Sequence, residues 1–194
     1  MIKQKIIAVA VIVFLSAISA YFIFDDYLIR NVIAASKQAL VVPKILPVVK
    51  VARLKIPKIK VDAPVIYAGL TPAGEIAVPK GPVEVSWFNL GPKPGEIGSA
   101  IISGHYGWKD KIPAVFDNLS KLKKGDKVTF QDEKGVTTTF VVRATKIYSQ
   151  NAKATEVFVS TDGKAHLNLI TCGGVWDKKQ KSYSTRLVVF TDKI

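Results

Sequence analysis

Cys172 is the only cysteine of the 194-residue chain, and it closes an apolar run at residues 167–171. Gly173 and Gly174 follow it, so a strand ending here would carry the thiol to the rim of a sheet with space around it. The thiolate of cysteine is a strong nucleophile, but an ordinary thiol has a pKa of about 8.5 and needs a basic neighbour. A buried structural thiol is the alternative, because free cysteine is among the most buried residue types.

Two residues far away in the sequence have the chemistry that such a thiol needs. His105 stands in Ser-Gly-His-Tyr-Gly, and Arg186 begins an apolar run at residues 186–190. An imidazole can stabilise a thiolate and then protonate a leaving amine, and a guanidinium can stabilise an oxyanion. His105 lies 67 residues before Cys172, and Arg186 lies 14 residues after it. If the fold unites them, they predict acyl transfer through a thioester.

Three further residues are candidates for binding a substrate. Thr171 directly precedes the cysteine, so its hydroxyl and backbone are expected to line the site. Trp108 follows the histidine segment and Trp176 follows the cysteine segment, where an indole can wall an apolar groove, although burial in the core explains a tryptophan equally well. His166 has no comparable neighbours and is assigned no role.

No set of histidine, cysteine and carboxylate residues has the spacing of a zinc site. The carboxylates near the candidate segments are scattered along the sequence: Asp110, Asp132, Glu133 and Asp177. The sequence therefore predicts no cofactor and leaves calcium open.

The segments that must position these residues are short and apolar, with glycine and proline between them. Strands are expected at residues 99–103, 126–131, 137–148, 165–171 and 186–191, with a hairpin turn at 132–135. A loop that includes Trp176 is expected to join the last two, and it places Arg186 beside Cys172 if those strands pair. Within residues 53–194, only residues 112–122 are expected to be helical; a short amphipathic helix is also expected at residues 25–39, after the N-terminal apolar segment. This pattern indicates an all-β fold, either a closed barrel or a sandwich.

The N-terminal part has the features of a membrane anchor. Residues 6–24 contain no charge, and a helix of that length spans about 28 Å, close to the hydrocarbon thickness of a bilayer. Lysines precede the segment and aspartates follow it, which places the N-terminus in the cytosol and the remainder outside the cell. A cleaved signal peptide is the alternative. The predicted organisation is a cytosolic end and single-pass signal anchor at 1–25, an extracellular linker at 26–52 and a catalytic domain at 53–194.

Charge and compartment narrow the possible partners. The formal net charge is +13, which suits an anionic cell envelope or lipid headgroups. No arginine-rich helix, zinc-ligand set or aromatic RNA-binding motif occurs, so no nucleic-acid partner is expected. Exported proteins usually pair their cysteines, so a solitary one outside the cell favours a thiol kept for its reactivity.

Taken together, three segments and the place of Arg186 resemble the sortases, the membrane-anchored cysteine transpeptidases of Gram-positive and related cell surfaces. Residues 54–65 (Leu-Lys-Ile-Pro-Lys-Ile-Lys-Val-Asp-Ala-Pro-Val) are similar to the family's opening strand. Ser-Gly-His, ending at His105, is similar to its histidine motif, and Leu-Ile-Thr-Cys, ending at Cys172, is similar to its cysteine motif. Arg186 stands just before a terminal apolar strand, as the family's arginine does.

The resemblance covers roughly residues 50–194. It implies a single eight-stranded β-barrel of the sortase type with short helices, preceded by an N-terminal transmembrane helix. Residues 91–95 and 172–174 look most like the compact sortases of class F or class E.

The resemblance also implies roles for the three residues: Cys172 as nucleophile, His105 as proton donor and Arg186 as the group that stabilises the oxyanion. The implied substrates are secreted proteins with a C-terminal sorting signal of the L-P-x-T-G kind, cut between Thr and Gly. An amine from a cell-wall precursor or a protein subunit then releases the thioester, or water hydrolyses it. Membrane lipid would hold the enzyme through its N-terminal anchor.

Two other classes of function remain open at the level of the sequence. One is a cysteine peptidase or an L,D-transpeptidase acting on peptidoglycan, which also uses histidine and cysteine on a β-rich fold. The segment around Cys172 lacks the Ser and Gly before the cysteine and the Arg after it that are typical of L,D-transpeptidases. The other class is a non-catalytic, membrane-tethered binding module with a decayed site.

Overall fold

The computed structural model describes residues 51–72 and 74–194, with Asp25 and Arg30 before them. The predicted anchor at residues 6–24 and nearly all of the predicted linker lie outside the described residues. Within the part of the chain that is described, no helix is both long and apolar enough to cross a membrane. The domain boundaries stay predictions.

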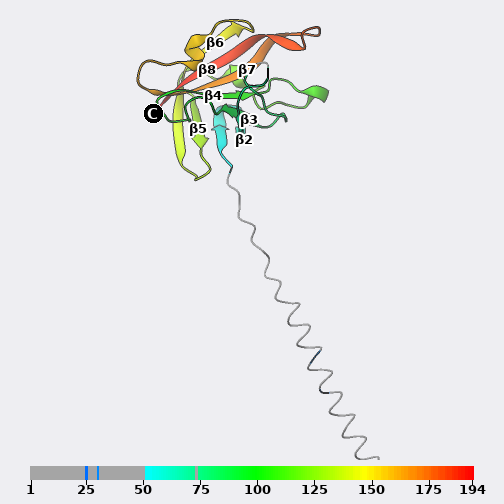
Figure 1. The fold of residues 1–194 in the computed structure, drawn as a ribbon, viewed down its shortest axis with the longest axis vertical. Helices are drawn as coiled ribbons and strands as arrows, with labels where there is room; N and C mark the ends of the chain where they lie inside the picture. Colours follow the sequence, from blue (N-terminus) through cyan, green and yellow to red (C-terminus); the bar gives the residue numbers. More distant parts are fainter. Residues whose placement is uncertain (1–24, 26–29, 31–50, 73) are drawn as a thin grey trace, which may run out of the picture. The chain divides into compact units, whose positions relative to one another are not determined.

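Eight strands of the described residues close into a barrel (Figure 1). Their bounds are Arg53–Ile56 (β1), Val61–Ala68 (β2), Val85–Phe88 (β3), Gly98–Gly104 (β4), Lys127–Gln131 (β5), Thr137–Ser149 (β6), Ala165–Asp177 (β7) and Ser182–Lys193 (β8). The order around the barrel is β1-β2-β3-β4-β7-β8-β6-β5, and β5 pairs back with β1. The pairs β2–β3 and β4–β7 are parallel, and the others are antiparallel. The barrel expected from the sequence is confirmed.

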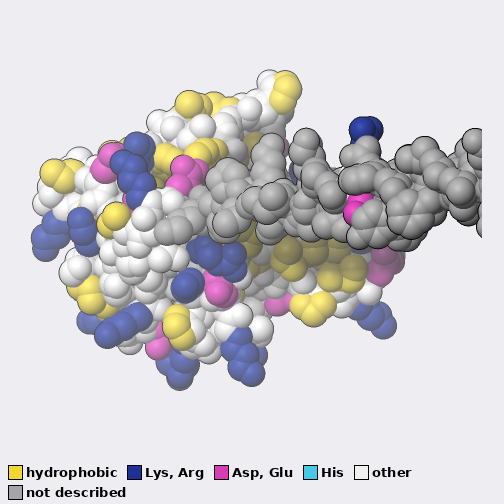
Figure 2. All heavy atoms as spheres, turned by 90° about the horizontal axis from the view of Figure 1, so that it is seen from below, with side chains coloured by type: hydrophobic (Ala, Val, Ile, Leu, Met, Phe, Trp, Pro, Cys, Tyr) yellow, Lys and Arg dark blue, Asp and Glu magenta, His cyan; other side chains and the backbone are white. Residues whose placement is uncertain are grey.

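Basic side chains are spread over the face of the molecule shown in Figure 2, in keeping with the net charge of +13. Some are paired across neighbouring strands, as in Arg53–Asp62 at 2.7 Å and Arg143–Asp192 at 3.0 Å. Exposed ion pairs of this kind stabilise a protein by only about 0–1 kcal/mol. The barrel is therefore held by strand pairing and by its core.

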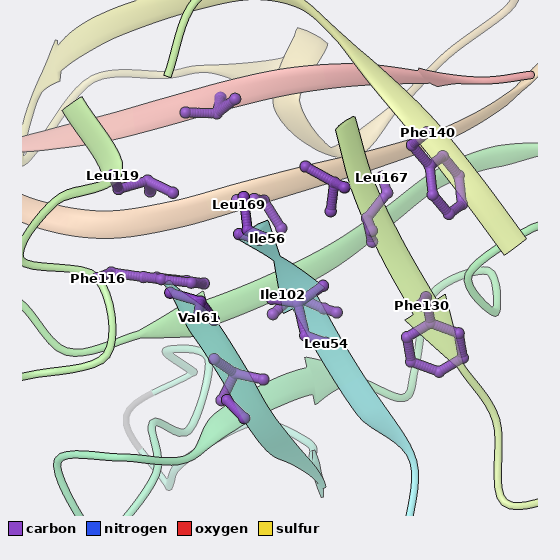
Figure 3. Close-up of a cluster of buried hydrophobic side chains, with 14 of the residues drawn as sticks. Leu54, Ile56, Val61, Ile102, Phe116, Leu119, Phe130, Phe140, Leu167 and Leu169 are labelled. Atoms are coloured by element: carbon purple, nitrogen blue, oxygen red, sulfur yellow. The ribbon is translucent and has the colours of Figure 1, made fainter. Parts of the chain in front are cut away.

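The core fills the inside of the barrel with alternate side chains of its strands (Figure 3). On β1, Leu54 and Ile56 are fully buried, while the lysine between them points outward. Phe116 and Leu119, from the connection between β4 and β5, are also fully buried in this cluster. Burying one such side chain stabilises the fold by about 1.5–3 kcal/mol.

A smaller apolar cluster covers the outer face of the barrel. It contains Ile101 of β4, Val188 and Phe190 of β8, and Val157. Val157 belongs to the short helix α2 (Thr155–Phe158), which lies in the connection between β6 and β7 and which the sequence did not predict. The strands of this region thus bury side chains on both faces, and among the outward ones Asn168 of β7 donates a 2.7 Å hydrogen bond to the carbonyl of Val157.

The helix expected at residues 112–122 is wrong. The connection contains two single 3-10 turns, η2 (Lys109–Lys111) and η3 (Leu119–Lys121), with irregular backbone between them. Pro113 disfavours the helical conformation at the residue before it. The Asp117 carboxylate accepts hydrogen bonds from the backbone N–H groups of Gly107 and Ala114. Side-chain bonds of this kind compete with the helical backbone ladder.

The two strands that carry Cys172 and Arg186 are longer than expected. β7 continues beyond Cys172, so Trp176 lies in a strand and not in the predicted loop. Gly174 explains the continuation, because it has φ +79° and occupies a bulge where β7 has two residues opposite one of β8. The hairpin predicted around residues 132–135 is confirmed as β5 and β6.

Candidate active site

Strand pairing places Cys172 and Arg186 side by side. They are direct partners in the antiparallel register of β7 and β8. Opposed residues of such a pair have Cα atoms about 4.5–5.5 Å apart and project from the same face of the sheet. That face is the outside of the barrel, because the next residues, Thr171 and Leu187, are buried inside. Cys172 and Arg186 are both partly exposed.

The parallel pair β4–β7 brings the histidine to the same edge. Ser103 lies opposite Ile170, so His105, just beyond β4, arrives next to Cys172 near the end of the β7 pairing. Both residues line one cavity of about 700 Å³. The rest of the lining comes from residues 106–109 and from the hairpin between β7 and β8. The fold therefore unites the thiol and the imidazole that the sequence separates by 67 residues.

Three contacts fix the orientation of His105. Its Nε2 lies 2.7 Å from the carbonyl oxygen of Pro79. A carbonyl can only accept, so Nε2 carries a proton and donates it. The Trp108 ring meets the imidazole edge to face, with 4.7 Å between ring centroids, and the carbonyl of His105 accepts the N–H of Phe116 at 3.0 Å. Nδ1 is therefore the ring nitrogen left to exchange a proton with a ligand.

Glycines on both sides of the histidine let its loop pack closely against its neighbours. A Cβ atom on Gly104 would lie 2.7 Å from the ring of Phe116. Gly107 has φ +64°, and a Cβ atom there would lie 2.8 Å from Oη of Tyr183. Asp117 holds the loop further, because its carboxylate accepts the N–H of Gly107 at 2.7 Å. The loop is thus fixed between the core and the β7–β8 hairpin.

Arg186 is anchored in the start of its own strand. Its Nη1 donates to the carbonyls of Tyr183 at 2.8 Å and Thr185 at 3.0 Å, and its Nη2 donates to Oγ of Ser182 at 3.2 Å. A guanidinium has five N–H donors, so two remain after these bonds within the described residues. Arg186 is therefore beside the thiol and keeps donors for a ligand, although it does not line the 700 Å³ cavity.

Thr171 lies differently from the expectation. Its side chain is only 3% exposed and points into the barrel, where Oγ1 donates a 2.8 Å hydrogen bond to the carbonyl of Gly104. Alternation along a strand explains this, because an outward Cys172 requires its neighbour to face inward. The hydroxyl ties β7 to the residue before His105 and does not reach the cavity.

Both tryptophans line the cavity. Trp108 does so beside the imidazole. Trp176 is 47% exposed, and its ring meets that of Tyr183 with centroids 5.0 Å apart. The site therefore has the apolar walls expected from the sequence.

Two tyrosines complete these walls and were missed by the sequence analysis. The rings of Tyr106 and Tyr183 lie 5.5 Å apart, and both line the cavity. Burial raises the pKa of Tyr183, and the neighbouring charges of Tyr106 and Cys172 add to the effect. Its phenol thus stays protonated at neutral pH. The aromatic neighbours of His105 and Arg186 in the sequence were the available signal.

Cys172 also borders a second, smaller hollow. It has a volume of about 160 Å³ and is lined among others by Phe116, Ser120, Gly173 and Leu187. The thiol therefore stands between two depressions, an arrangement that suits an extended chain passing the nucleophile on both sides.

His166, which was assigned no role, is a structural residue far from the thiol along β7. It is 4% exposed, with Nδ1 2.8 Å from the Asp192 carboxylate and Nε2 3.0 Å from that of Asp162. The hydrogen bond to His166 is the main reason why the pKa of Asp162 is lowered. The imidazole links the β6–β7 connection to the end of β8.

Across residues 51–72 and 74–194, no three histidine, cysteine or carboxylate side chains come together in a way that could hold a metal ion. The absence of a cofactor stays a prediction, and the question of calcium stays open.

A closed barrel with a thiol, an imidazole and a guanidinium at one rim has the arrangement of a cysteine-dependent acyl-transfer site. A family model described as the sortase domain matches residues 54–194. The chain therefore belongs to the sortase family, whose members are cysteine transpeptidases. A comparison with curated protein sequences gave no match.

Solved structures of sortases share the fold. A lid mutant of sortase A from Corynebacterium diphtheriae has a TM-score of 0.59 and 23% identity, with 78% of this chain and 74% of that chain covered. The pilus-related sortase C of Group B Streptococcus has a TM-score of 0.56 and 24% identity, with 77% of this chain and 70% of that chain covered. A sortase D5 transpeptidase of Clostridium perfringens has a TM-score of 0.55 and 21% identity, with 75% of this chain and 79% of that chain covered. These structures belong to several classes, so the class of this chain stays open.

Proposed function

We propose that the chain is a membrane-anchored transpeptidase that cleaves a C-terminal sorting signal of the L-P-x-T-G kind through a thioester on Cys172. The observation that carries the proposal is the meeting of Cys172 and His105 in one cavity, with Arg186 as the strand partner of the cysteine. Membership of the sortase family supports the same reaction class.

In the first half of the proposed reaction, Sγ of Cys172 attacks the carbonyl carbon of the signal's threonine. The tetrahedral intermediate carries an oxyanion, and the free N–H groups of Arg186 stabilise it. The C–N bond to glycine then breaks, and His105 gives a proton to the leaving amine. Because Nε2 of His105 is occupied by the Pro79 carbonyl, this proton comes from Nδ1.

In the second half, an amine from a cell-wall precursor or a protein subunit attacks the thioester. The new C–N bond replaces the C–S bond, and the thiol is regenerated. Water in place of the amine gives hydrolysis. The charge-free segment at residues 6–24 is proposed as the single-pass anchor that keeps this site outside the cell.

The test is mass spectrometry of the full-length chain after incubation with a library of sorting-signal peptides. We expect an acyl adduct on Cys172 with at least one peptide, because the thioester is a covalent intermediate. Cys172→Ala should form no adduct and should cleave nothing. His105→Ala should slow acylation by about 100-fold or more, since it removes the proton donor.

Cleavage by the Cys172→Ala variant would refute the nucleophile, and a near-native rate for His105→Ala would remove the imidazole from the mechanism. If no peptide labels a folded chain, the non-catalytic binding module becomes the better description.

A further inference from the structure

The cavity that holds Cys172 and His105 carries positive charge that the mechanism above does not use. Lys109 and Lys181 are among its lining residues, and no aspartate or glutamate is. Among the described lysines, Lys146 has an ion pair with Glu156, and Lys193 donates to the carbonyl of Gly95. Neither cavity lysine has an ion pair or a side-chain hydrogen bond to another described residue. Two unpaired cations therefore face the space next to the thiol.

The charges around the cavity mouth do not cancel this excess. Residues 105–111 and 176–183, the two segments that supply the lining, contain five lysines and two aspartates. The Asp177 carboxylate accepts the backbone N–H groups of Lys179 and Gln180, so it closes the hairpin turn. Asp110 stands next to Lys109 in the sequence and does not line the cavity. A net positive rim remains, which favours an anionic group in the ligand.

Position and chemistry indicate which part of the substrates meets these lysines. Any amine that leaves or enters must lie within hydrogen-bonding reach of His105, because the imidazole exchanges a proton with it. Lys109 is in the same loop, four residues beyond His105, and Lys181 lies in the hairpin that supplies the rest of the lining. Groups attached to the amine therefore lie in the cavity that both lysines line.

We propose that the acceptor of acyl transfer is an amine that also carries a carboxylate, and that Lys109 and Lys181 bind this carboxylate. The inference rests on the proposed function and specifies its acceptor. The rings of Trp108 and Trp176 supply apolar surface for the aliphatic part of such a molecule.

The transfer step forms one bond and breaks one, and a proton moves from the amine to the thiolate. The amine nitrogen attacks the thioester carbonyl carbon, the C–N bond forms and the C–S bond breaks. The proton lost by the amine passes through His105 to the released thiolate of Cys172. The nearby ammonium groups assist, because they disfavour protonation of the incoming amine, which must attack as the free base.

The test compares two acceptors that differ in a single group. Nα-acetyl-lysine and Nα-acetyl-lysine amide present the same side-chain amine, but only the first has a carboxylate. With the full-length chain and a sorting peptide that acylates Cys172, we expect kcat/KM for the carboxylate acceptor to be about five-fold higher, as for one or two partly exposed ion pairs. This preference should weaken as salt is added. In a double variant, Lys109→Ala with Lys181→Ala, the ratio should fall to about one.

The matched control is the double variant Lys134→Ala with Lys164→Ala, which removes the same charge from exposed positions outside the cavity and should keep the ratio. Equal kcat/KM for both acceptors, or a ratio that the Lys109–Lys181 double variant leaves unchanged, overturns the inference while the acyl-enzyme still forms. Failure to form an acyl-enzyme with any peptide instead overturns the proposed function, and the inference with it.

Discussion

At the scale of single residues, the site depends on hydrogen bonds that give each side chain one orientation. The imidazole of His105 is held by a backbone carbonyl at Pro79, which no change of side chain removes directly. The guanidinium of Arg186 is held by two carbonyls and one hydroxyl of the same strand. Pre-orientation of this kind lowers the cost of organising the transition state.

Arg186→Lys tests how much of this orientation matters. Lysine keeps the charge but has a single nitrogen on a flexible stem, so it cannot hold the strand carbonyls and also offer a planar fork. We expect acylation by a sorting peptide to slow by at least about 10-fold, a loss of about 1.4 kcal/mol in transition-state stabilisation.

Arg143→Lys is the matched control, because Arg143 lies on β6 and pairs with Asp192 outside the cavity. Pre-steady-state adduct formation followed by mass spectrometry measures both variants. Equal rates for Arg186→Lys and the parent chain would show that the guanidinium plays no part in acylation.

At the scale of the elements, the decisive contact is between the loop after β4 and the β7–β8 hairpin. Gly107 touches Tyr183 so closely that no Cβ atom fits between them, and Tyr183 also packs against Trp176. The two segments that line the cavity are thus fitted to each other. Their contact fixes the position of His105 relative to Cys172.

Gly107→Ala should slow the reaction as well as destabilise the fold, because the added Cβ atom meets Tyr183 in addition to straining the backbone. Both Gly107 and Gly163 have a left-handed backbone, but a Cβ atom on Gly163 meets nothing within 4 Å. Each substitution should lower the free energy of unfolding by about 1–2 kcal/mol through its conformation. Only Gly107→Ala should also slow acylation, because it pushes the loop away from the hairpin.

Adding Tyr183→Phe to Gly107→Ala removes the oxygen that the new Cβ atom would meet and should restore part of the lost rate. Chemical unfolding and acylation kinetics, measured with the single Tyr183→Phe variant as reference, check both effects. If Gly107→Ala is acylated as fast as Gly163→Ala, the contact between Gly107 and Tyr183 does not affect the reaction.

At the scale of the whole molecule, β7 and β8 join two regions with different tasks. Near one end they hold Cys172 and Arg186, and near the other His166 links Asp162 to Asp192. The second region stabilises the β6–β7 connection without touching the cavity. The stability that these contacts provide should therefore change with pH, and this change should not affect catalysis.

Asp162→Asn tests this separation. The pKa of Asp162 is lowered in the folded protein from its usual 3.8, chiefly by hydrogen bonding to His166. A lowered carboxyl pKa means that the ionised group stabilises the fold above pH 3.8 and that this stabilisation is lost as the pH falls below that value. The variant should have a lower Tm than the parent chain at pH 7, and the difference should shrink at pH 3.

Asp110→Asn, an exposed carboxylate with no hydrogen bond or ion pair to the described residues, is the control and should leave Tm unchanged at both pH values. Thermal unfolding, monitored by circular dichroism, gives the Tm of the parent chain and of both variants at each pH. A difference that stays constant from pH 7 to pH 3 would mean that ionisation of Asp162 does not stabilise the fold.

The order of residue types along the chain was enough to predict the reactive groups and an all-β fold. Cys172, His105 and Arg186 were identifiable because each stands at an end of an apolar segment, and the strands followed from short apolar segments with glycine and proline between them. These signals are local, and strand formation obeys them closely. The prediction of a helix at residues 112–122 was wrong, because the Asp117 carboxylate binds backbone N–H groups and so favours an irregular backbone there.

The direction of each side chain and its contacts became known from the folded chain. The register of β7 and β8 turned Cys172 outward, and the same register turned Thr171 into the barrel. The Pro79 carbonyl, the tyrosine walls and the unpaired lysines of the cavity depend on segments that are distant in the chain. Such contacts form when the barrel closes, and no spacing in the sequence encodes them, because one residue of shift along a strand reverses every side chain.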